Sequence, residues 1–214
     1  MKKLVTIAAL LLALSVSMKV QAQLNLNIGF APERVHSSIG GDKAIDTTYW
    51  LAGFFAGLNY KIQVTEQVGV TIGAQYRMNV RNVSKHIYEG SYFSHYVVRE
   101  RQTLVDLPIM VHYDIPLGPK FSLSPFVGPM LSFAISGSTN SELTYPHNQS
   151  FNDDWYDKNS TKSRFNVYGM AGLEAIYNRI NVFVGYRMGL LDLDKSDLIN
   201  TRVSGAFVGI GHSF

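Results

Sequence analysis

The chain has 214 residues, 46% of them hydrophobic and 16% charged, which limits it to one domain of ordinary size or a compact membrane protein. Three of its 19 Lys and Arg lie in the first 22 residues, and the other 16 balance 16 Asp and Glu, which removes the main support for a nucleic-acid partner. With no cysteine, the mature chain is neither a disulfide-stapled domain nor a lipoprotein.

The first 22 residues have the pattern of a secretory signal peptide. Lys2 and Lys3 are followed by an apolar stretch at 4–16 and by a small-residue cleavage site at 20–22. A membrane anchor is the alternative, but the stretch is shorter than the ~18 residues that span a bilayer. We therefore expect cleavage after Ala22 and a mature domain over residues 23–214.

After the signal, apolar side chains alternate with small or polar ones, which predicts strands with two different faces. In residues 68–80, for example, Ile72 and Tyr76 share an apolar face, whereas Gly73 and Arg77 lie on the other. The same alternation along the chain predicts eight strands, near residues 24–34, 49–62, 68–80, 97–115, 120–137, 164–177, 180–193 and 202–214.

The second face of these strands carries mainly Gly, Ser, Asn, Thr and Gln, which suits a confined interior better than the water-exposed face of a soluble sandwich. The connections also differ by end: those at 35–48, 81–96 and 138–163 are long, and those at 63–67, 116–119 and 178–179 are short. Both features predict an all-β fold, a closed antiparallel transmembrane β-barrel of about eight strands. It is an up-and-down meander in the bacterial outer membrane, with short periplasmic turns and long extracellular loops.

Aromatic residues are expected in two girdles on the lipid-facing side of this barrel. Those near the short turns are Tyr60, Tyr113, Phe121, Tyr177 and Phe214. Those near the long loops are Trp50, Tyr76, Phe133, Phe165 and Tyr186.

Two segments resemble a known family. Residues 103–113 (TLVDLPIMVHY) and 125–129 (PFVGP) are similar to the Tyr-Leu-Glu-Ile-Pro and Pro-Tyr-x-x-Gly-Pro signatures of the PorT-like outer-membrane β-barrel domain of Bacteroidetes. Residues 185–190 and 209–214 resemble the final hairpin of that family, and Asp106 stands where the family has Glu. The resemblance implies insertion by the barrel assembly machinery through a terminal signal that ends at Phe214, and it implies no single activity.

Charged residues on the inward face carry both signs in comparable number, so we expect them to pair as a plug in a narrow lumen. They are Glu33, Lys61, Arg77, Glu100, Asp106, Asp114, Arg164, Glu174 and Arg187. A proton or ion path is the alternative interpretation. A diffusion porin is disfavoured because water-filled pores need about 16–18 strands.

The longest loop combines aromatics with Asn and Asp, a mixture suited to stacking on sugars or docking on a protein. Its candidate ligand or partner residues are Tyr145, His147, Phe151, Asp153, Asp154, Trp155 and Tyr156, and an ordered cap is the alternative. Asp153, Asp154 and Asp157 lack the spacing of an EF-hand, so we expect no metal and no cofactor.

We therefore expect a structural or adhesive role through the extracellular loops. The expected partners are outer-membrane lipid including lipopolysaccharide, an extracellular protein or a glycan, and not nucleic acid. A small channel and a lipid-modifying enzyme are the alternatives. A deacylase-like site needs His beside Ser, but Ser213 points away from His212. For an omptin-like protease, His95, His147, Asp153 and Asp154 are candidates by location only, and we expect no enzyme.

Overall fold

The computed structural model describes residues 22–39, 45–89, 92–144, 149–158, 160–196 and 198–214. The expected signal peptide, Tyr145 and His147 lie outside these residues. The strands are β1 (Ala22–Phe30), β2 (Glu33–Ile39), β3 (Ile45–Gln63), β4 (Val68–Glu89), β5 (Tyr92–Tyr113), β6 (Ile115–Pro116), β7 (Phe121–Thr144), β8 (Gln149–Asp154), β9 (Phe165–Tyr177), β10 (Ile180–Gly189) and β11 (Ile199–Ser213). No helix among the described residues is long and apolar enough to cross a membrane.

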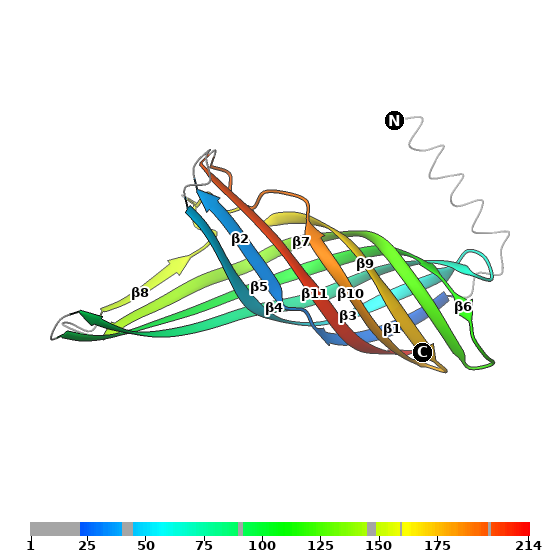
Figure 1. The fold of residues 1–214 in the computed structure, drawn as a ribbon. Coiled ribbons are helices and arrows are strands. Elements are labelled where there is room, and N and C mark those ends of the chain that lie inside the picture. Colours follow the sequence, from blue (N-terminus) through cyan, green and yellow to red (C-terminus); the bar gives the residue numbers. More distant parts are fainter. Residues whose placement is uncertain (1–21, 40–44, 90–91, 145–148, 159, 197) are drawn as a thin grey trace, which may run out of the picture.

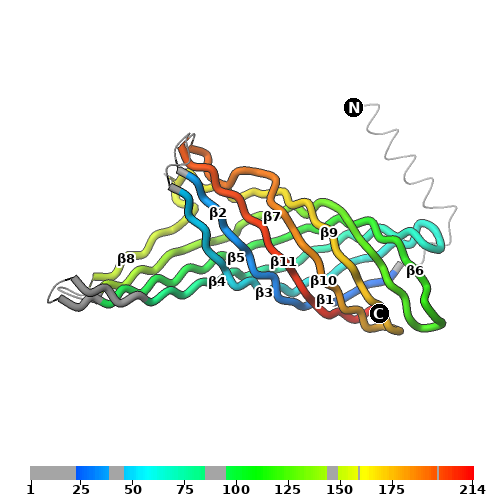
Figure 2. Tube along the Cα trace, viewed as in Figure 1, coloured from blue at the N-terminus to red at the C-terminus, as the bar shows by residue number. Residues whose placement is uncertain are grey.

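The strands form a closed antiparallel ring (Figure 1). Consecutive strands pair along the chain, and β1 and β2 together fill one position, between β3 on one side and β11 on the other. Figure 2 shows the blue first strand beside the red last strand, where the ring closes. The ring therefore has eight members, as the alternation predicts, and no free edge remains within it.

The long connections differ from the expectation, because much of their length is strand. β4 and β5 continue through most of 81–96 and pair as far as Glu89 and Tyr92, and β7 continues to Thr144. These segments carry polar residues on both faces, so the alternation that marks a lipid-facing strand is lost although the backbone stays extended. The short turn between β9 and β10 is tight, with Asn178 at a φ of 58°, a conformation that Asn tolerates.

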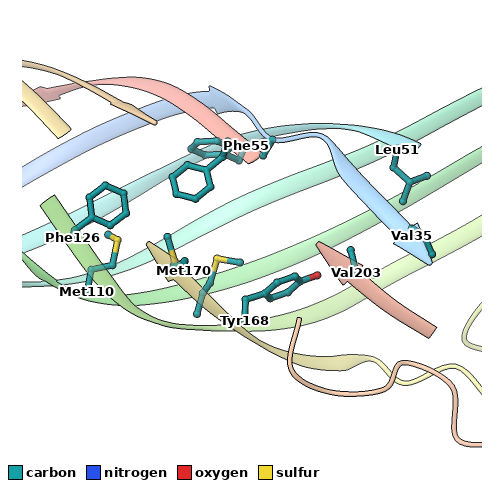
Figure 3. Packing of buried hydrophobic residues seen from close by; sticks show 11 residues of the cluster. Val35, Leu51, Phe55, Met110, Phe126, Tyr168, Met170 and Val203 are labelled. Atoms are coloured by element: carbon teal, nitrogen blue, oxygen red, sulfur yellow. The ribbon is translucent and has the colours of Figure 1, made fainter. Parts of the chain in front are cut away.

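The outward face is apolar, and the ten predicted girdle aromatics are all exposed on it, from Phe121 at 39% to Phe214 at 70%. The inward face is more apolar than expected. Figure 3 shows the buried cluster, which includes Phe55, Phe126 and Met170. Several inward rings lie over a glycine of the next strand: a Cβ on Gly29 would lie 2.4 Å from the Phe55 ring. Large and small residues thus alternate and fill the narrow interior.

Candidate functional site

Four charged side chains form a layer inside the barrel. Glu33 comes from β2, Arg77 from β4, Asp106 from β5 and Arg187 from β10, and each is at most 3% exposed. Arg77 donates to Asp106 from Nε at 2.6 Å and from Nη2 at 3.1 Å, and it also donates to Glu33. Arg187 Nη2 lies 3.0 Å from Glu33 Oε1. Two cations and two anions balance in these four residues, which we call the charged layer.

Neutral side chains complete the contacts of the charged layer. Ser132 donates to Asp106 at 2.5 Å, and Asn79 and the Tyr168 hydroxyl both donate to Glu33, the latter at 3.2 Å. Both guanidinium groups lie 5.7 Å from the centroid of the Tyr168 ring. A buried charge is costly unless it is paired and hydrogen-bonded. Here each charge has an ion-pair partner, whereas Arg187 Nε is buried without a hydrogen-bond partner in the described part of the chain.

Cavities lie on both sides of the charged layer. The cavity toward the short turns has a volume of about 50 Å³ and is lined by Asn27, Asn59 and Phe126, among others. The cavity toward the long hairpins has a volume of about 70 Å³ and reaches Tyr49 and Trp155. One water molecule needs roughly 10–15 Å³ of such volume, so each cavity has room for only a few waters.

Unpaired polar atoms face the cavity toward the short turns. The Oδ1 atoms of Asn27, Asn59 and Asn181 and the Nε2 atom of His112 are buried without a hydrogen-bond partner within the described part of the chain. Buried polar groups in folded proteins are normally satisfied by protein or ordered water. We therefore expect ordered water in this cavity.

A second ion pair lies at the end of the barrel with the short turns. Lys61 Nζ lies 2.8 Å from both oxygens of Asp114, which also accepts from Gln63 at 2.9 Å and from Ser124 at 2.6 Å. Burial raises the pKa of the Asp114 carboxyl, but these hydrogen bonds and the Lys61 charge outweigh burial and hold that pKa below its usual value. The carboxylate form of Asp114 therefore stabilises the fold.

At the opposite end, the residues after β8 fold back over the mouth of the barrel. Trp155 is 7% exposed, and its indole donates to Thr139 at 2.6 Å. Tyr156 accepts from Gln102 at 2.7 Å. Gly137 makes this possible, because a Cβ there would lie 2.8 Å from the Trp155 ring. We call Trp155 and Tyr156 the cap.

Two cations rest on the cap. Lys162 Nζ lies 4.1 Å from the centroid of the Trp155 ring, and the Arg164 guanidinium carbon lies 4.7 Å from that of Tyr156. Arg164 also donates to the backbone carbonyls of Ile135 at 3.0 Å and Tyr156 at 3.2 Å. Burial lowers the pKa of Lys162. Lys162 is thus held at the mouth by a ring face, and Arg164 by a ring face and carbonyl oxygens.

Beyond the mouth, β4, β5, β7 and β8 continue as a sheet that projects away from the ring (Figure 1). β3 last pairs with β4 at Val80, so β5 is the only described strand that pairs with residues 81–89. At the other edge, β8 pairs only with β7 among the described strands, and all six of its residues are exposed. We call residues 81–89, 92–100, 138–144 and 149–154 the projecting sheet.

Most of the predicted lumen charges do point inward. Glu33, Arg77, Asp106 and Arg187 form the charged layer, Lys61 pairs with Asp114, Glu174 lies 3.5 Å from His112, and Glu100 lies 3.3 Å from Arg81. Arg164 is the correction, because it is exposed at the mouth. β9 begins one residue later, at Phe165, so strand alternation does not determine the direction of Arg164.

The predicted loop residues separate into two groups. Phe151, Asp153 and Asp154 are exposed on β8, whereas Trp155 is buried in the cap and Tyr156 is half-buried beside it. The terminal Phe214 is exposed next to His212, with 4.9 Å between the ring centroids. No cluster of three His, Asp or Glu that could hold a metal ion occurs in the described ranges.

Sequence reasoning missed the neutral members of the site. Alternation places Asn79 and Ser132 on the inward face but does not identify their partners. Asn79 reaches Glu33 across β3, whereas Ser132 lies opposite Asp106 on the neighbouring β5. Nothing in the sequence marks Tyr168 as a residue of the site, since an inward aromatic side chain is typical of any filled barrel.

The family match is consistent with this geometry. Residues 17–195 match the outer membrane protein beta-barrel domain family. Ail, the attachment invasion locus protein of Yersinia pestis, is 16% identical, with 91% of this chain and 99% of that chain covered and a TM-score of 0.43. The outer membrane protease OmpT of Escherichia coli is 11% identical, with 92% and 99% covered and a TM-score of 0.43.

OprG of Pseudomonas aeruginosa is 12% identical, with 91% of this chain and 97% of that chain covered and a TM-score of 0.37. A search among curated proteins found no match. At such identities, none of the solved structures assigns a role to this chain.

Proposed function

The chain belongs to the outer membrane protein beta-barrel domain family, and on that premise we propose that it is a closed, non-conducting barrel that acts by binding at its extracellular end. The charged layer is the main evidence that the lumen is closed. The projecting sheet supports the binding role. The similarity of residues 103–113 and 125–129 to the PorT-like signatures supports membership of that branch of the family.

Closure follows from the cost of separating the charged layer. An ion that crosses the barrel must pass the buried contacts of Arg77 with Asp106 and Glu33. Breaking a buried ion pair costs about 3–5 kcal/mol, because it leaves a desolvated charge without a partner. Water-filled outer-membrane pores are built from about 16–18 strands, twice the number in this ring.

Planar-bilayer recording tests the closed lumen. Residues 23–214, inserted into a bilayer, are expected to give no stable open channel, whereas a trimeric porin added to the same bilayer gives steady conductance. A reproducible open state of the wild-type chain would overturn the closed-barrel proposal.

The binding role rests on the exposed backbone of the projecting sheet. Residues 81–89 of β4 and the outer edge of β8 present N–H and C=O groups that no described strand pairs. Such edges accept an extended segment of a partner by strand addition. We propose that an extracellular protein or glycan is bound there, with the exposed Phe151 as an aromatic contact.

Trimming the sheet at matched register positions tests this role. Val83 pairs with Val98, and Asn140 pairs with Asn152. Replacing residues 84–97 and 141–151 with Asn-Gly turns therefore removes both hairpin tips and retains the cap. Cells that carry the trimmed barrel are expected to lose adhesion to host matrix or glycan arrays that wild-type cells bind. Equal adhesion at equal surface abundance would contradict the proposal.

We propose no enzymatic activity. His212 is exposed on the outer face, whereas Ser213 forms a hydrogen bond with Asn25 on the inner side. His95 forms a hydrogen bond with Ser84 within the projecting sheet. Mass spectrometry of lipid A from cells with and without the gene is expected to give identical species. A deacylated species that depends on the gene would contradict this part of the proposal.

A further inference from the structure

A hollow on the rim of the mouth gathers positive charge. It has a volume of about 350 Å³ and lies between the loop after β8 and the loop before β11. Four of its lining residues are cations, Lys158, Lys162, Arg164 and Lys195, and one is an anion, Asp157. We call it the rim pocket.

Among the described residues, the cations of the rim pocket form no contact ion pair, although Lys162 interacts electrostatically with Glu100, Asp153 and Asp194 at longer range. None of the four is in an ion pair within the described part of the chain. The nearby carboxylates accept hydrogen bonds from uncharged donors: Asp157 accepts from the Lys158 amide at 2.6 Å, and Asp194 accepts from the Ser196 amide at 2.9 Å and from Thr161 at 3.2 Å. With four cations and only Asp157 as an anion in its lining, the pocket has a net positive charge.

The rim pocket also has a fixed shape. Lys162 and Arg164 rest on the Trp155 and Tyr156 rings of the cap, and Arg164 is held by backbone carbonyls. A guanidinium that is positioned in advance loses little entropy when it binds an oxyanion, and its planar N–H groups match phosphate oxygens.

The position of the pocket indicates the source of the anion. Phe165, the first residue of β9, lines the pocket and is also a girdle aromatic whose side chain is 42% exposed. Leu190, which directly follows β10, is 53% exposed, and Leu198 in the same loop is 71% exposed. Girdle aromatics mark the level of the headgroups, so the cations lie directly above the hydrocarbon.

We propose that the rim pocket binds the phosphorylated saccharide headgroup of an outer-leaflet glycolipid. This inference rests on the proposed extracellular position of the mouth. Cations at the level of anionic headgroups attract them, so the loss of two of these cations is expected to weaken binding by at least tenfold.

The test uses residues 23–214, refolded in a detergent that contains no glycolipid and titrated with diphosphorylated lipid A, with phosphate-free lipid A and with soluble glucosamine 6-phosphate. The pocket variant is Lys158→Gln with Lys195→Gln, which changes two exposed side chains. The matched control is Lys120→Gln with Arg179→Gln, two exposed cations at the short turns.

Diphosphorylated lipid A is expected to bind at least tenfold more tightly than the phosphate-free form. The pocket variant should lose this preference, and the control variant should keep it. Equal binding of both lipids, equal loss in both variants, or equal affinity for the soluble sugar phosphate would each overturn the inference. None of these outcomes bears on conductance or on the projecting sheet, so the proposed function is tested separately.

Discussion

Arg77 contacts two carboxylates at once, so its loss leaves Asp106 and Glu33 buried without their main partner. Arg77→Gln is expected to lower the free energy of unfolding by about 3–5 kcal/mol, measured by urea titration in lipid vesicles.

The control for Arg77→Gln is Arg99→Gln, which breaks an ion pair with Glu142 whose side chains are 56% and 45% exposed. An exposed pair contributes about 0–1 kcal/mol. Comparable losses in the two variants would show that the charged layer does not stabilise the barrel.

Asp114 gives the stability a defined pH dependence. Hydrogen bonds hold its pKa in the folded chain below its usual value, so its contribution is present above the unfolded pKa of about 3.9 and is lost as pH falls through the folded pKa. Asp114→Asn should therefore be less stable than the wild type at pH 7, and the difference in urea midpoint should shrink toward pH 3. A difference that stays constant across this range would contradict the assignment.

At the scale of the element, the cap depends on one buried indole. Trp155→Ala removes the contact with Lys162 and the hydrogen bond to Thr139. The loss of a buried aromatic side chain is expected to lower the stability of the cap by about 3–5 kcal/mol. Limited proteolysis is expected to cut residues 149–165 faster while the ring of strands stays intact. Phe151→Ala, at a side chain that is 60% exposed, should not change the rate.

The strands of the ring could be predicted from the sequence because lipid imposes one chemistry on every outward position. Ile72 and Val182 are both 50% exposed and both apolar, and this repetition makes the pattern visible. The extended strands outside the membrane could not be predicted in this way. Apolar and polar residues do not alternate regularly over 81–89, so the sequence there resembles a loop.

The site could be predicted only in part, because partners depend on which strands meet across the ring. Alternation gives the inward direction of Arg77 and Glu33, but their contact joins β4 to β2 with β3 between them. The burial of Trp155 depends on the space above Gly137, which no local pattern reveals.

At the scale of the whole molecule, closure of the ring explains the other features together. The ring pairs every neighbouring strand, and its narrow interior forces Glu33, Arg77, Asp106 and Arg187 into contact. The projecting sheet and the rim pocket lie at the mouth, beyond this ring. We therefore propose that binding takes place at the mouth, while the charged layer in the lumen stabilises the barrel.

Single-cysteine scanning along β4 tests this account most directly, because the chain has no cysteine of its own. With a spin label at each position in vesicles, Val70, Ile72 and Tyr76 should be accessible to lipid-soluble oxygen, while Thr71 and Asn79 should be protected from both oxygen and a water-soluble nickel complex. Nickel accessibility at Ile72 and Tyr76 would contradict the lipid-facing surface, and nickel accessibility at Thr71 and Asn79 would contradict the closed lumen.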